Sequence, residues 1–132
     1  MGTTAALVGP VGVIAPNNGH YVFAGPAATV TTTVEHPRVS GMASAPLGLA
    51  PGSPLQYADV GMCFQPPGGE VTNFYGSNFS VHAFTTTRAD YATAATVVLA
   101  PGSYQVGMCV RNNGASPIQN NNYVSGFVQV TS

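Results

Sequence analysis

Charged side chains are scarce in this sequence. They make up 5% of its 132 residues, against roughly 25% in an ordinary soluble domain. Lysine is absent, and three scattered arginines leave a net charge of −1. Because nucleic acids and anionic membranes are held by clustered cations, both partners are disfavoured. A nearly uncharged surface also resists self-association poorly, which favours a homo-oligomer or a larger protein assembly.

Side chains that carry out chemistry are equally few. The four acidic residues and three histidines are dispersed, at no spacing typical of paired catalytic carboxylates, a calcium loop or a zinc site. The Gly-x-Ser-x-Gly motif of a nucleophile elbow is absent. We therefore expect no enzymatic activity, no metal and no cofactor.

Long apolar runs are also missing. The longest, residues 5–16, is interrupted by Gly and Pro and is too short to span a bilayer. The first 16 residues carry no charge, whereas a secretory signal begins with a positive region. We expect either a mature form with an added Met or a protein that leaves its cell by another route, and in both cases a location that is extracellular or on a virion surface.

Uninterrupted helix-forming windows are lacking, because 16 Gly and 11 Pro are spread along the chain and disfavour helix interiors. Alternating or β-branched runs remain, separated by Gly, Pro and Asn clusters. They predict one all-β domain over residues 1–132, an antiparallel β-sandwich of eight or nine strands with jelly-roll or Ig-like Greek-key topology. The expected strands are residues 7–14, 20–24, 28–35, 39–47, 55–64, 78–87, 92–99, 104–111 and 123–131.

A Pro-Gly corner precedes one of these strands. Pro101 and Gly102 suit the central positions of a type II turn. Tyr104 follows this corner as in the tyrosine corner of Greek-key sandwiches. Strand alternation then assigns Tyr104, Val106, Met108 and Val110 to the core.

Two short motifs occur twice. Residues 49–53 repeat as 99–103, and Val-Gly-Met-Cys at 60–63 repeats at 106–109, which indicates two similar turn-strand units, the alternative being a chance match. Both cysteines should then point away from the core. If their strands are neighbours, Cys63 and Cys109 are predicted to form a disulfide between opposed ladder positions; the alternative is two inert, half-buried thiols.

Asparagines gather in the loops. Asn tolerates turn conformations, and loops on a rigid sandwich are frequent contact sites. The segment 112–122 is long enough to project. The predicted contact residues are Asn112, Asn113, Asn120, Asn121, Asn122 and Tyr123.

These observations favour a non-catalytic structural or assembly protein that acts through protein contacts. Virion proteins, such as capsid-decoration or tail-associated domains, and extracellular fibre or surface subunits have such compositions. The alternative is a secreted carbohydrate-binding or adhesion module, in which amide side chains bind hydroxyls and exposed tyrosines stack on sugars. The tyrosines considered for that platform are Tyr21, Tyr57, Tyr75, Tyr91 and Tyr123.

Overall fold

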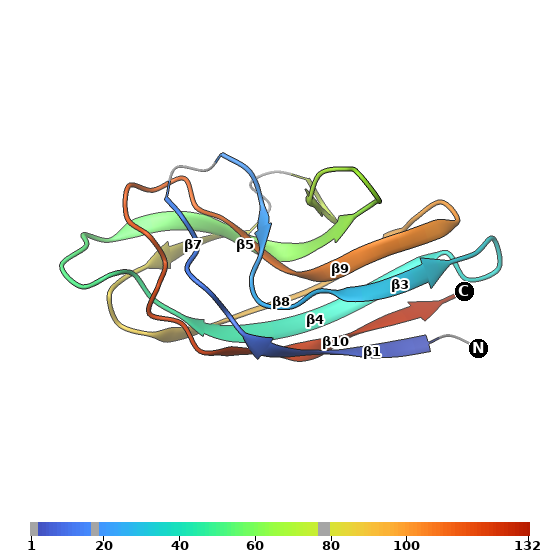
Figure 1. Cartoon of the computed structure of the whole chain (residues 1–132), viewed down its shortest axis with the longest axis horizontal. Coiled ribbons are helices and arrows are strands. Elements are labelled where there is room, and N and C mark those ends of the chain that lie inside the picture. Colours follow the sequence, from blue (N-terminus) through green and yellow to red (C-terminus); the bar gives the residue numbers. More distant parts are fainter. Residues whose placement is uncertain (1–2, 17–18, 77–79) are drawn as a thin grey trace.

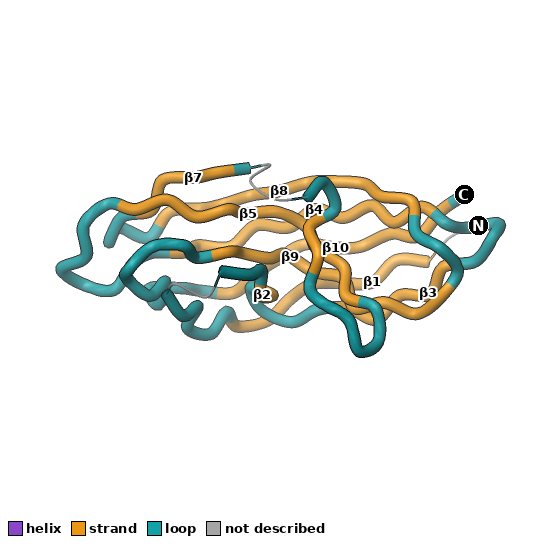
Figure 2. Tube along the Cα trace, turned by 90° about the horizontal axis from the view of Figure 1, so that it is seen from above, coloured by secondary structure: helices purple, strands orange, loops and turns teal. Residues whose placement is uncertain are grey.

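A computed structural model describes residues 3–16, 19–76 and 80–132. These residues form strands and loops without a helix (Figure 2), so the predicted all-β class is confirmed. The strands are β1 (Thr3–Pro10), β2 (Val22–Phe23), β3 (Ala28–Thr32), β4 (Arg38–Leu47), β5 (Gln56–Gln65), β6 (Thr72–Asn73), β7 (Val81–Phe84), β8 (Ala89–Val98), β9 (Gly102–Arg111) and β10 (Tyr123–Thr131).

The strands make two antiparallel sheets packed face to face (Figure 1). One sheet has the order β1-β10-β4-β8. In the other, β9 and β5 are central; β2 and β3 pair with the free side of β9, and β6 and β7 with the free side of β5. With the two-residue strands β2 and β6 left out, the sheets have the orders β1-β10-β4-β8 and β3-β9-β5-β7. When these eight strands are renumbered from 1 to 8 along the chain, the orders become 1-8-3-6 and 2-7-4-5. This is the jelly-roll order, so the topology is the jelly roll and not the Ig-like alternative.

Alternation along the long strands builds the core between the sheets. In β4 the residues Val39, Gly41, Ala43, Ala45 and Leu47 are buried and the residues between them are more exposed. The predicted core face of β9 is confirmed: Val106, Met108 and Val110 are buried and Tyr104 is half-buried. The largest fully buried side chains are Phe84, Leu7, Leu47, Leu49, Met62, Met108, Ile118, Val39, Val60, Val106, Val110 and Val124.

The two copies of the Val-Gly-Met-Cys motif lie side by side in β5 and β9. Met62 is paired with Met108, and the cysteine of each copy is paired with the glycine of the other, so the two copies are related by a local two-fold at the methionine pair. The Met62 side chain reaches across to the other sheet, where a Cβ on Gly41 would lie 2.5 Å from its terminal methyl carbon. The glycine therefore provides the space that Met62 fills in the core.

The Pro-Gly corner before β9 differs from its prediction. A type II turn needs a positive φ at its glycine, but Gly102 lies in β9, pairs with Thr32 of β3 and is not among the positive-φ glycines. Strand pairing thus overrides the local turn preference. The equivalent Gly52 has φ 82°. The tyrosine corner is confirmed, because the Tyr104 hydroxyl donates a hydrogen bond to the Ala100 carbonyl at 2.8 Å.

Strand boundaries also differ in places. The first strand begins at Thr3 rather than residue 7, and the two-residue β6 was not predicted. The expected strand 78–87 corresponds to β7, and its residues 78 and 79 lie outside the described residues.

Candidate functional site

The outer face of the six-stranded sheet is partly covered by the chain itself. Tyr21 and the half-buried Phe23 and Val71 pack over Cys63 and Cys109, in a cluster separate from the main core. Both cysteines have 0% exposure. This region, called the covered face below, owes its burial to side chains of β2, of the residue before β2 and of the residue before β6.

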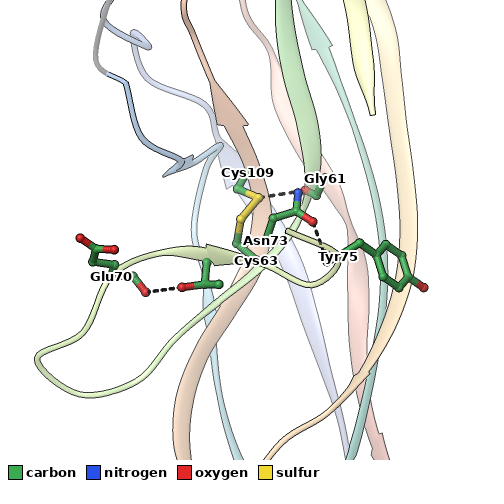
Figure 3. The surroundings of a disulfide bond; sticks show 7 residues. Gly61, Cys63, Glu70, Asn73, Tyr75 and Cys109 are labelled. Atoms are coloured by element: carbon green, nitrogen blue, oxygen red, sulfur yellow. Dashed lines mark hydrogen bonds between the residues drawn. A yellow bond between two sulfur atoms is a disulfide. The ribbon is translucent and has the colours of Figure 1, made fainter. Parts of the chain in front are cut away.

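The structure joins Cys63 to Cys109 by a disulfide, with 5.8 Å between the Cα atoms (Figure 3). The predicted opposed pairing is wrong in detail, because Cys63 is directly opposite Gly107, and Cys109 is opposite Gly61. The cysteines are therefore diagonal neighbours on one face of the sheet. A glycine opposite each cysteine leaves room for the bridge, and the Cys109 Sγ lies 3.3 Å from the Gly61 carbonyl oxygen.

Asn73 covers this bridge from β6. A Cβ on Gly61 would clash with the Asn73 side-chain nitrogen. The Asn73 Oδ1 accepts a hydrogen bond from the Tyr75 N–H at 2.8 Å, and the Thr72 hydroxyl donates to the Glu70 carbonyl (Figure 3). These bonds fix the local conformation of the segment, and the pairing of Asn73 with Cys63 holds it beside the disulfide.

An ion pair is buried beside the disulfide. Asp59 is 2% exposed, and its Oδ2 accepts hydrogen bonds from Arg111 Nε at 2.8 Å and Nη2 at 2.5 Å. The Arg111 guanidinium also lies over the Tyr21 ring, 5.1 Å from its centroid. Two of the seven charged residues are thus used to hold the covered face together.

The asparagine-rich segment does not project as predicted. Ile118 is fully buried and forms bridges with Ile14 and Leu49. Asn112 is 0% exposed; its Oδ1 accepts from Gln56 Nε2 at 2.8 Å, and its Nδ2 donates to the Ser116 carbonyl at 2.9 Å. Asn112 is therefore a structural residue, and its assignment as a contact residue is wrong.

Other asparagines of this segment also bond internally. Asn120 accepts a hydrogen bond from Arg88 at 2.9 Å and is half-buried. The half-buried Asn121 donates to the Gly12 carbonyl at 3.0 Å. Asn113, Asn122 and Tyr123 are exposed. Of these, Tyr123 lies on β10, on the outer side of the four-stranded sheet.

The tyrosines do not form a common platform. Tyr21 and Tyr91 are buried, whereas Tyr57 and Tyr123 are exposed on β5 and β10, which belong to different sheets. The hydroxyl of Tyr75 accepts a hydrogen bond from the Thr96 N–H at 3.2 Å, at the edge of β8.

Tyr91 packs inside the sandwich. Its ring is stacked on Phe84 with centroids 4.1 Å apart, and its hydroxyl donates to the Ala83 carbonyl at 2.7 Å. Burial raises the pKa of Tyr91 above its usual value. This shift follows from the packing of the ring.

The outer face of the four-stranded sheet is different. Strand pairing arranges twelve outward side chains in three rows across β1, β10, β4 and β8. All twelve are exposed or half-buried, and none is charged. We call these twelve residues the bare face: Val8, Ser125, Ser44 and Ala92; Ala6, Phe127, Met42 and Ala94; Thr4, Gln129, Ser40 and Thr96.

Apolar contact surface is concentrated in the middle row of the bare face. Phe127 is 40% exposed and Met42 48% exposed. Beside them, small side chains leave a shallow depression of about 390 Å³, lined in part by Ser44, Ala92 and Ser125. Exposed apolar side chains grouped in this way are typical of contact surfaces.

Charges stand at the two ends of the bare face. Asp90 of β8 pairs with Pro46, beyond one outer row, and Arg38 of β4 pairs with Val98, beyond the other. Within the described part of the chain, neither charged side chain has an ion-pair partner. The face is therefore a neutral strip with one acidic and one basic end.

The described residues include no group of three or more His, Cys, Asp and Glu side chains placed to hold a metal ion. No helix within the described ranges is long and apolar enough to cross a membrane. Comparison with known proteins gave no relative: no family model, curated protein or solved structure matches this chain.

Proposed function

We propose that this protein is a non-catalytic structural subunit that acts through protein–protein contacts in an assembly outside the reducing cytosol. The observation that carries the proposal is the bare face, a row-ordered, uncharged sheet surface with Met42 and Phe127 at its centre. Burying exposed apolar groups of this kind against a partner lowers the free energy of the complex.

The disulfide supports the location. The buried Cys63–Cys109 bridge is compatible with an extracellular protein, because structural disulfides persist on secreted proteins and on virion and cell surfaces. We propose in particular a virion surface protein, such as a capsid-decoration or tail-associated domain, or a subunit of an extracellular fibre. Jelly rolls build viral capsid domains as well as lectins, although a fold alone does not determine function.

The arrangement of the cations supports protein over nucleic acid or membrane as the partner. Arg111 is paired with Asp59, and Arg88 donates to Asn120. Arg38 stands apart at one end of the bare face. Such separated cations match neither a row of phosphates nor an anionic lipid surface.

The test combines light scattering on a sizing column with a glycan array. We expect a mass of two or more copies of the 13.4 kDa chain and no glycan signal. A 13.4 kDa monomer that binds glycans would contradict the proposal and favour the carbohydrate-binding module. A monomer at every concentration without glycan binding would contradict self-assembly.

A further inference from the structure

The ends of the bare face are placed symmetrically about its middle row. Along β4, Arg38 lies four residues before Met42, and Pro46, the partner of Asp90, lies four residues after it. Met42 itself belongs to the middle row, paired with Phe127 and Ala94. The acidic and basic ends are thus equally far from the centre in opposite directions.

This symmetry makes the surface complementary to itself. We propose that the bare face packs against the bare face of a second copy of this chain, about a two-fold axis that crosses the strands at the middle row. The rotation places Met42 and Ala94 over the same row of the partner copy. It also brings the Arg38 end of each copy over the Asp90 end of the other, so that two symmetric ion pairs flank an uncharged centre. This inference rests on the proposed function, since it names the partner of the same surface.

The size of the face agrees with such a dimer. The bare face and the two charged rows at its ends make five rows across four strands, and strands about 4.8 Å apart with a rise of about 3.4 Å per residue give these rows an area of about 600 Å². Two such faces in contact bury about 1,200 Å², the lower limit for a specific and stable interface. Aligned packing of two sheets about 10 Å apart is an ordinary arrangement for sandwich layers.

A second copy fits better than a strongly charged partner. The uncharged rows offer no attraction to a charged surface, and burying an unpaired charge against them would cost free energy. The net charge of −1 means that two copies hardly repel each other. The same chain already supplies the opposite charge required at each end.

Charge exchange at the two ends tests the arrangement. In Asp90→Arg, two arginines face each other at each end, and in Arg38→Asp, two aspartates do. We expect each single variant to weaken the dimer about ten-fold in analytical ultracentrifugation. The double variant R38D/D90R restores opposite charges and should return to within about three-fold of the original Kd. The matched control Glu70→Arg makes the same charge change on an exposed residue of the loop before β6 and should leave the Kd unchanged.

Cross-linking tests the position of the axis. The native cysteines are both in the disulfide, so a cysteine introduced by Ala94→Cys is the chain's one free thiol. A short bis-maleimide should join two copies through it. The control Ala83→Cys lies on the exposed side of β7 in the other sheet and should give little product.

The outcomes separate this inference from the proposed function. An assembled mass with no effect of the charge exchange and equal cross-linking at both positions would overturn the face-to-face dimer and leave the structural role standing. A monomer at all concentrations would overturn the dimer and self-assembly together. Weakening by both single variants, recovery in the double variant and selective cross-linking through residue 94 would support the dimer.

Discussion

The two outer faces of this sandwich differ in how far the chain's own side chains cover them. On the covered face, the chain places Tyr21 and Val71 over a disulfide, buries Asp59 against Arg111 and leaves both cysteines without solvent contact. On the bare face, twelve uncharged side chains remain exposed or half-buried. The chain thus stabilises one face with its own segments and leaves the other for a partner, so substitutions on the two faces should affect different properties.

Removing the disulfide should have the largest effect on stability. The bridge spans 46 residues, and closing a loop of that length contributes about 4 kcal/mol in the chain-entropy account. We expect Cys63→Ala/Cys109→Ala to lose about this much free energy of unfolding in urea titrations. A loss below about 1 kcal/mol would show that the cover of Tyr21, Phe23 and Val71 stabilises this face without the bridge.

Breaking the buried ion pair should rank second. Asp59→Ala leaves the largely buried Arg111 guanidinium without its carboxylate, at a cost of about 3 kcal/mol. Urea titration again gives the value. The control is Glu70→Ala, which removes an exposed carboxylate and should change stability by less than about 0.5 kcal/mol. Equal effects of the two substitutions would contradict a structural role for the ion pair.

Raising the pH into the alkaline range should lower the free energy of unfolding by a smaller amount. The pKa of Tyr91 is raised in the folded protein, so the native state holds its proton where the unfolded chain, with a pKa of about 10, has lost it. The contribution to stability is therefore complete below about pH 10 and is lost as the pH rises through the higher folded pKa. In urea titrations across that range, Tyr91→Phe should flatten the decline, whereas Tyr57→Phe, at an exposed tyrosine, should not.

Polar substitution on the bare face should have the smallest effect on the folded monomer. Met42→Gln and Phe127→Gln replace exposed side chains and should change the free energy of unfolding, measured under conditions where the chain is monomeric, by less than about 0.5 kcal/mol. A loss of about 2 kcal/mol or more would mean that these side chains stabilise the monomer, and the contrast between the two faces would fail.

Local sequence patterns were sufficient to predict most strands, the core side of β9 and the orientation of both cysteines, because alternation and strand propensity act over a few residues. They failed at Gly102, where pairing with Thr32 of a distant strand overrides the turn preference of Pro-Gly. They also failed for Asn112, whose burial depends on Gln56, 56 residues away in sequence.

The bare face could not be predicted for a related reason. Its rows exist because β10, at the end of the chain, lies between β1 and β4, so that Ala6, Phe127, Met42 and Ala94 stand side by side. No local pattern relates these four positions. Absence of charge at the twelve positions of the bare face was visible in the sequence, and combined with the strand order it would have revealed the face.

The most direct test of the contrast between the faces is the solution mass of two matched variants, measured by light scattering on a sizing column. Met42→Arg places a charge at the centre of the bare face, and Val81→Arg places one on a similarly exposed apolar residue of β7 in the other sheet. Met42→Arg should reduce the assembled species to the 13.4 kDa monomer, while Val81→Arg should keep the assembled mass. Equal masses for the two variants, or dissociation by Val81→Arg alone, would contradict the assignment of the bare face as the contact surface.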